Sequence, residues 1–143
     1  MSRSSDSFEG SLNGPRMKIV DAECIREVAE RVVRAAAKEG NSVIVGRGSA
    51  YYLRDRPDAF HVFVYAPFEE KVNRLRAMGK TEEDAVELAE TVDRDRAAFI
   101  KQYFNVDWPT RHFFHLMINS TIGDEAVVQM ILNGVAAFEK QPA

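Results

Sequence analysis

Residues 41–50 are Asn41-Ser42-Val43-Ile44-Val45-Gly46-Arg47-Gly48-Ser49-Ala50, and this stretch decides the fold that we expect. It follows Gly40, contains three consecutive aliphatic residues, and ends with an arginine between two glycines. Such a run predicts a short strand, buried on both faces, that opens into a tight turn. Ligands of α/β proteins bind at the carboxyl ends of strands, so this turn would hold Arg47 where an anion could reach it.

Upstream of this stretch, the sequence predicts a helix from Ala22 to Glu39. Asp21 is a suitable N-cap, and Gly40 is a suitable residue to end the helix. Apolar residues recur between them at the spacing that gives a helix one buried face. They are Ile25, Val28, Ala29, Val32, Val33 and Ala36.

Downstream, the apolar run at residues 60–66 predicts a second strand, which Pro67 ends. A helix is predicted from Phe68 to about Met78, with Glu69 and Glu70 at the positive end of its dipole. Gly79-Lys80 would break this helix, and Thr81 would cap a longer one that runs towards Tyr103.

The last part of the chain predicts one more strand and one more helix. Residues 115–123 form an apolar run with a polar end, and Asp124 is a suitable cap for the helix that follows. The alternation of apolar strands and helical crossovers predicts an α/β fold, a parallel sheet with helices on both faces. We expect one domain over residues 17–143, after a flexible arm at residues 1–16 that is rich in Ser, Gly and Asp.

Composition narrows the possible functions. The formal net charge is -3 and no basic patch is visible, which disfavours binding to nucleic acid. A single cysteine, Cys24, cannot form an internal disulfide. No apolar run suits a signal peptide or a membrane span, so we expect a cytoplasmic protein.

Arg47 is the first candidate for binding. A guanidinium at a strand exit can make paired hydrogen bonds with a phosphate or a carboxylate. The alternative is a salt bridge that pins the turn to Asp55 or Asp58, and spacing alone does not separate the two.

The second candidate is a set of arginines between the strands at 60–66 and 115–123. Arg94 and Arg96 alternate with Asp93 and Asp95, which by itself is typical of a solvated helix face. Together with Arg74 and Arg76, however, they place four arginines on a segment of helix, break and helix. Mobile arginines of this kind neutralise charge during phosphoryl transfer.

The three histidines do not form a metal signature. His112 and His115 are three residues apart, but no third ligand lies near them, so we expect packing or surface roles for both and for His61. We expect no bound metal from the protein's own residues.

The order of motifs resembles the later part of the cytidylate kinase-like family, over about residues 25–132. The segments that carry the resemblance are residues 43–48, Leu53-Arg54-Asp55, residues 62–67, residues 93–99, residues 103–108 and residues 116–120. The family is similar to nucleoside monophosphate kinases, which have a P-loop α/β core and an arginine-bearing lid. The resemblance implies that residues 68–108 form this lid.

Roles for individual residues follow from the resemblance alone. Arg47 and Asp55 would bind the acceptor nucleotide, and Arg94 and Arg96 would be the catalytic arginines of the lid. The residues on the donor side would be Arg74 or Arg76, near the phosphates, and Asn119 and Ser120, near the base. ATP and Mg²⁺ would be the cofactors of an active protein.

The family's first strand, its phosphate loop with a lysine, and the following helix find no match in the sequence. We therefore expect a P-loop kinase-like fold that lacks these elements, and a phosphotransferase that is incomplete or inactive in this chain. The alternative is a non-catalytic nucleotide-binding, oligomeric scaffold or regulatory domain derived from a kinase. An incomplete sheet exposes an edge and an apolar face, so we also expect a homo-oligomer.

Overall fold

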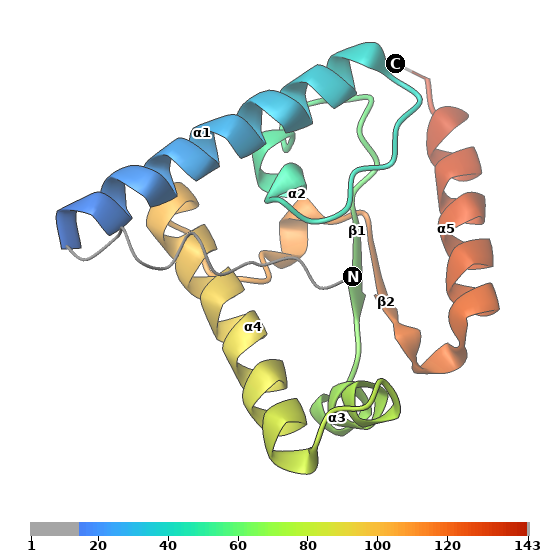
Figure 1. Ribbon diagram of the computed structural model, residues 1–143. Helices are drawn as coiled ribbons and strands as arrows, with labels where there is room; N and C mark the ends of the chain where they lie inside the picture. Colours follow the sequence, from blue (N-terminus) through green and yellow to red (C-terminus); the bar gives the residue numbers. More distant parts are fainter. Residues whose placement is uncertain (1–14, 143) are drawn as a thin grey trace, which may run out of the picture. The chain divides into compact units, whose positions relative to one another are not determined.

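The structure is a computed structural model that describes the backbone of residues 15–142 and the side chains of residues 22–142. It divides into two compact units, the first ending at Tyr52 and the second beginning at Leu53. The first unit contains α1 (Pro15–Glu39) and α2 (Ser49–Tyr52). The second contains β1 (Val62–Tyr65), α3 (Phe68–Ala77), α4 (Glu82–Phe104), the 3₁₀-helix η1 (Arg111–Phe113), β2 (Leu116–Asn119), the 3₁₀-helix η2 (Ser120–Ile122) and α5 (Asp124–Glu139) (Figure 1).

Helix α1 begins earlier than the sequence predicted. It starts at Pro15, whose fixed φ suits the first helical turn, so Asp21 lies inside the helix and is not its N-cap. The predicted end is confirmed, because Gly40 follows with a φ of 75° and its N–H donates to the Ala36 carbonyl at 3.2 Å. Of the arm predicted at residues 1–16, Pro15 and Arg16 belong to α1, and residues 1–14 lie outside the described residues.

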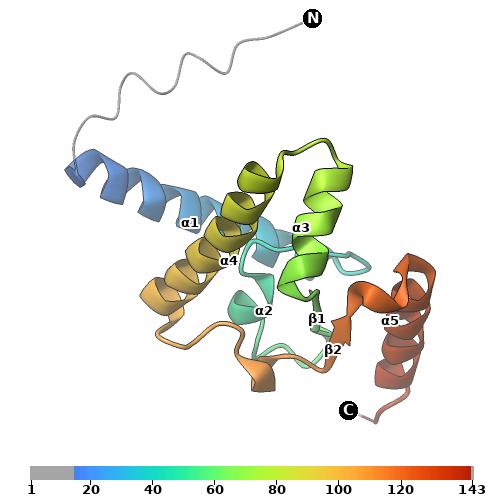
Figure 2. The same cartoon turned by 90° about the horizontal axis from the view of Figure 1, so that it is seen from below.

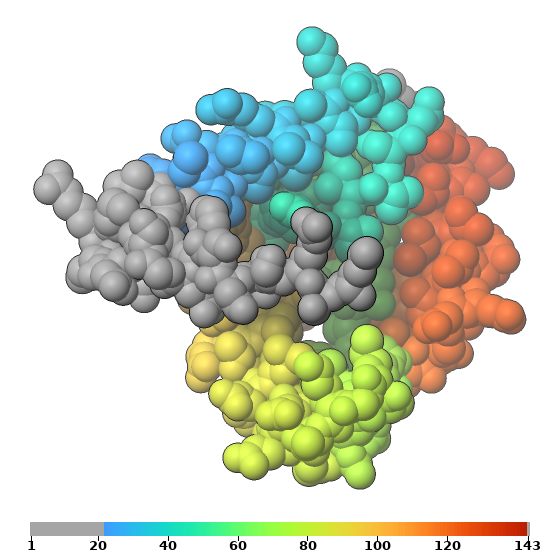
Figure 3. Space-filling model, viewed as in Figure 1, coloured from blue at the N-terminus to red at the C-terminus, as the bar shows by residue number. Residues whose placement is uncertain are grey.

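Only part of the predicted core face of α1 is buried. Val33 is fully buried, whereas Ile25, Val28 and Val32 are 68%, 52% and 60% exposed. Within the first unit α1 packs against α2. Because α2 is a single helical turn, it can cover one row of α1 side chains but not the whole apolar face. The part of α1 whose side chains are described is drawn in blue to cyan in Figure 3.

The strand predicted at Val43-Ile44-Val45 does not form. Residues 42–45 have no regular secondary structure, and Val43 and Val45 are 92% and 84% exposed. A strand exists through hydrogen bonds to a neighbouring strand, and the sheet in the described part of the chain contains β1 and β2 alone. Val43, Ile44 and Val45 are β-branched and so favour a strand. The prediction is wrong because no described segment pairs with them.

The other two predicted strands are confirmed, although both are shorter than expected. β1 and β2 run parallel, in a register that pairs Val62 with Leu116 and Tyr65 with Asn119. The second unit combines this parallel sheet with helices, so the predicted α/β class is confirmed (Figure 2).

The helix, break and helix predicted between the strands are also confirmed. Gly79, with a φ of 95°, separates α3 from α4, and Thr81 caps α4 by accepting a hydrogen bond from the Asp84 N–H at 3.2 Å. The two helices share a small apolar core. It consists of Val72, Ala85 and Ala89, with Leu75 and Val86 packed against them.

Helix α5 packs against β2. Asp124, the predicted cap, is instead the first residue of the helix, and Gly123 with a φ of 98° takes the N-cap position. The carboxylate still lies in the first turn, where the helix dipole favours negative charge. None of the described helices is long and apolar enough to cross a membrane.

The close approach of α5 to Phe60 gives a stability prediction. A Cβ added at Gly134 would lie 2.8 Å from Phe60 Cζ, and the Phe60 ring is held between His115 and Phe138 at centroid distances of 5.4 and 5.3 Å. Gly134→Ala gains about 1 kcal/mol of helix propensity, but the forced shift costs roughly 1–3 kcal/mol. We expect a net loss of up to about 2 kcal/mol in urea unfolding.

A double-mutant cycle provides the control. In a Phe60→Leu background the obstructing ring is absent, so Gly134→Ala should stabilise the protein there. Stabilisation by Gly134→Ala in both backgrounds would show that the helix does not approach Phe60 this closely.

Candidate functional site

The two strands of the sheet end side by side. Tyr65 and Asn119, their last residues, pair with each other, so the chain leaves both strands at the same edge. Ala66 and Pro67 then lead into α3, and Ser120 begins η2. We call this region the carboxyl edge, and in open α/β sheets it is the edge at which ligands bind.

Ser120 joins three elements at the carboxyl edge. Its side chain is buried, and its hydroxyl donates to the Tyr65 carbonyl at 3.0 Å. The same hydroxyl accepts a hydrogen bond from Arg74 Nη1 at 2.9 Å, and Arg74 Nη2 donates to the Ser120 carbonyl at 3.3 Å. Ser120 therefore connects the end of β1, the end of β2 and helix α3.

Arg74 has a third contact on its own helix. Its Nε donates to Glu70 Oε1 at 2.8 Å, one helical turn earlier. The Arg74 side chain is 43% exposed, so the guanidinium is held by hydrogen bonds and still accessible from solvent. The carboxyl edge thus presents one oriented cation.

Asn119 shapes the turn beside Ser120. Its Oδ1 accepts hydrogen bonds from the Thr121 N–H at 3.1 Å and from Thr121 Oγ1 at 2.9 Å, as in an Asx-turn. The structure therefore brings together Arg74, Asn119 and Ser120, three of the four residues predicted on the donor side.

Arg76, the fourth, lies apart from them. Its Nε pairs with Glu82 Oε2 at 2.9 Å, across the break between α3 and α4. The sequence left Arg74 and Arg76 as alternatives, and the geometry places Arg74 at the carboxyl edge.

Arg94 and Arg96 are exposed on α4. Arg94 Nη2 reaches back to Thr91 Oγ1 at 3.5 Å, and Arg96 Nη1 lies 3.4 Å from Asp93 Oδ1. Asp93 also accepts a hydrogen bond from Lys71 Nζ, which links α4 to α3. The two predicted catalytic arginines therefore have loose contacts on their own helix.

Arg47 belongs to the first unit, in a turn closed by a 3.1 Å hydrogen bond from the Ser49 N–H to the Gly46 carbonyl. Its φ is 59°, and the flanking Gly46 and Gly48 also have positive φ values, of 69° and 68°. A left-handed conformation costs an arginine roughly 1–2 kcal/mol. Its side chain is exposed.

The acidic residues considered with Arg47 belong to the second unit and have neighbours of their own. Asp58 binds Arg56 through two hydrogen bonds of 2.7 and 2.8 Å, and this contact lowers the pKa of the Asp58 carboxyl. Asp55 is largely exposed, and its Oδ2 lies 3.9 Å from Arg54 Nε.

Two histidines pair where the strands begin. The His61 N–H donates to His115 Nδ1 at 2.9 Å, the His115 N–H donates to the His61 carbonyl at 2.8 Å, and the rings stack at 5.5 Å. Burial lowers the pKa of His61 below the usual 6.5; a hydrogen bond with the Leu53 carbonyl opposes this, and His115 adds to it. The described residues include no group of three that could hold a metal ion.

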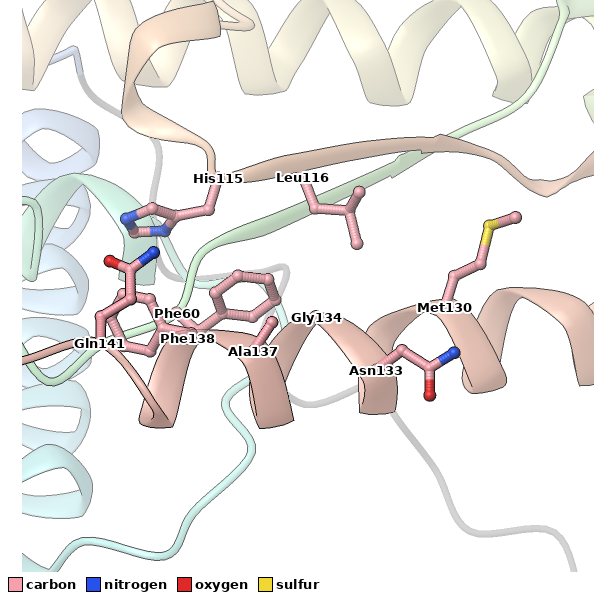
Figure 4. A pocket seen from close by; sticks show the side chains of 9 residues that line it. All are labelled: Phe60, His115, Leu116, Met130, Asn133, Gly134, Ala137, Phe138 and Gln141. Atoms are coloured by element: carbon pink, nitrogen blue, oxygen red, sulfur yellow. The ribbon is translucent and has the colours of Figure 1, made fainter.

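A groove of about 570 Å³ lies near the same end of the sheet, between β2 and α5 (Figure 4). Phe60, Leu116, Met130 and Phe138 line it, and its lining among the described residues includes no Asp, Glu, Lys or Arg. An apolar groove without a cation does not suit a phosphate, so we do not place the candidate site there.

Two contacts at the carboxyl edge were missed in the sequence, those made by Glu70 and by the Tyr65 carbonyl, and so was the contact of Lys71 with Asp93 that links α3 to α4. The spacing of Glu70 and Arg74, four apart on a predicted helix, was an available signal. Lys71 and Asp93 are 22 residues apart on different helices, so no local pattern connects them. Every residue has a backbone carbonyl, so a sequence does not indicate which one accepts a hydrogen bond.

The lowered pKa of His61 predicts a pH dependence of stability. Between this lowered value and 6.5, the unfolded chain binds more protons than the folded chain, so stability rises with pH. The contribution is complete above pH 6.5 and is lost as the pH falls through the folded-state pKa. His61→Gln, which keeps a donor for the Leu53 carbonyl, should flatten this part of a plot of urea midpoint against pH.

His112→Gln is the matched control, because His112 is exposed. This substitution should leave the change of urea midpoint with pH as it is in the wild type. If the urea midpoint of His61→Gln depended on pH as strongly as that of the wild type, the assignment of this effect to His61 would be contradicted.

Comparisons with known proteins agree with this architecture. A family model described as the cytidylate kinase-like family matches residues 2–122. The crystal structure of an uncharacterized protein from Eubacterium ventriosum is similar, with a TM-score of 0.65 and 20% sequence identity. The match covers 86% of this chain and 66% of that one, and at this identity it shows a shared fold alone. A comparison with curated proteins found no match.

Proposed function

We propose that this chain, which belongs to the cytidylate kinase-like family, binds a nucleoside phosphate at the carboxyl edge, with Arg74 as the residue that contacts the phosphate. The description of the family as cytidylate kinase-like supports a role for this chain that involves nucleotides and their phosphates. Its natural ligands would then be ATP and a nucleoside monophosphate.

One observation carries the proposal: the position of the Arg74 guanidinium, 2.9 Å from Ser120 Oγ where β1 and β2 end. A guanidinium makes short, paired, charge-assisted hydrogen bonds with phosphate oxygens. Arg74 is both oriented and partly open to solvent, as such a contact requires.

In a catalytically active form, Arg94 and Arg96 would neutralise charge on the transferring phosphoryl group from the exposed side of α4. Their loose contacts with Thr91 and Asp93 suit residues that must change partner when a ligand arrives. Arg47 and Asp55 would contribute to binding the acceptor nucleotide.

Mg²⁺ would enter as the complex with ATP. The described residues offer no cluster of three carboxylate, histidine or cysteine side chains, and Mg²⁺ is commonly held through nucleotide phosphates and water. We therefore assign no step of the reaction to a metal site of the protein.

Calorimetry with ATP and with CMP tests the proposal. Arg74→Ala removes charge-assisted hydrogen bonds worth roughly 1.5–3 kcal/mol, so it should weaken ATP binding by about 10-fold to 100-fold. Arg76→Ala is the matched control, because it removes the same side chain two residues away, where the guanidinium binds Glu82. It should change the affinity by less than about twofold.

Equal affinities of Arg74→Ala and the wild type, or no binding of either nucleotide by the wild type, would refute the proposal. A phosphotransfer assay with ATP, Mg²⁺ and a panel of nucleoside monophosphates then separates two forms of it. Turnover identifies a kinase, whereas binding without turnover identifies a non-catalytic nucleotide-binding domain.

A further inference from the structure

The hydroxyl of Ser120 has two hydrogen-bond partners inside the protein. It donates its one proton to the Tyr65 carbonyl and accepts a hydrogen bond from Arg74, and its residue is only 7% exposed. A hydroxyl carries a single donor, so Ser120 has none left for a nucleotide. Its position in the sequence suggests contact with a ligand, but its geometry gives it another task.

We propose that Ser120 is a positioning residue that holds Arg74 at the carboxyl edge, and that Glu70 occupies the part of the guanidinium that a phosphate takes over. This inference rests on the proposed function. It assigns different roles to the two partners of Arg74, one permanent and one exchangeable.

The hydrogen-bond inventory of Arg74 supports this division. A guanidinium has five N–H donors, and those used with described residues are one to Glu70 and two to Ser120. Donors therefore remain for a phosphate while both contacts with Ser120 persist. Release of Glu70 would add the Nε donor.

Burial and charge decide whether Arg74 gives up Ser120 or Glu70 when a phosphate binds. Ser120 is buried, and loss of its two contacts with Arg74 would leave buried oxygens, those of the Ser120 hydroxyl and the Ser120 carbonyl, without a charged donor, which is unfavourable. The Glu70 side chain is 36% exposed and can return to water at little cost. An arriving phosphate also repels the Glu70 carboxylate, because both are negative.

The prediction has two arms of opposite sign, both measured by calorimetry with ATP. Ser120→Ala should weaken binding by about fivefold to tenfold, although the side chain would not touch the ligand. Glu70→Gln should strengthen binding by about twofold to fivefold, because the competing charge is removed. Glu69→Gln, a change at an exposed neighbour, is the matched control and should leave the affinity unchanged.

A double-mutant cycle separates positioning from a general structural effect. In an Arg74→Ala background, Ser120→Ala should cause no further loss of affinity, because the residue that it positions is gone. Ser120→Thr, which retains a hydroxyl, should restore affinity to within about twofold of the wild type. Thermal melting of each variant confirms that it is folded.

The outcomes distinguish the two proposals. If Arg74→Ala weakens binding but Ser120→Ala does not, or if their effects simply add, the positioning role is refuted and the proposed function stands. If Glu70→Gln weakens binding or leaves it unchanged, Glu70 does not compete with the ligand. If Arg74→Ala has no effect, the proposed function itself fails.

Discussion

The candidate site depends on one constraint, the parallel pairing of β1 with β2 in a register that ends both strands at the same level. The last pair of the register is Tyr65 with Asn119. The Ser120 hydroxyl links the two strand ends by donating to the Tyr65 carbonyl. Because Pro67 ends β1 and α3 follows at once, Arg74 on the second turn of that helix reaches back to the same place. A shift of one residue in the register would separate Ser120 from its acceptor and leave Arg74 without its anchor.

Much of this arrangement could be predicted from local patterns. The apolar runs before Pro67 and Asn119 indicated the two strands, and Gly79 with Thr81 indicated the break between α3 and α4. Capping and β-branched composition act over a few residues, so they can be recognised in a sequence. The family resemblance pointed to Arg74 or Arg76 together with Asn119 and Ser120, and the structure shows that Arg74 contacts Ser120; their role towards a nucleotide stays a prediction.

What failed required information about distant partners. Val43 to Val45 has the composition of a strand, but pairing depends on a neighbour that no local pattern specifies, and two of these residues are almost fully exposed. Ile25 and Val32 match a helical core face, yet α2 is too short to cover it. Arg74 and Arg76 lie two residues apart on one helix, and the contact that places Arg74 at the carboxyl edge is with Ser120, 46 residues further along the chain.

The central claim is that the Arg74 guanidinium, held between helix and strand ends, receives the phosphate. It is tested most directly by following arginine Nε–H signals in nuclear magnetic resonance spectra while ATP is added. We expect the Arg74 Nε–H signal to move and to saturate at one ATP per chain, because its partner changes from Glu70 to phosphate. The Arg76 signal should stay in place. ATP binding that shifts Arg76 and leaves Arg74 unmoved would contradict this claim.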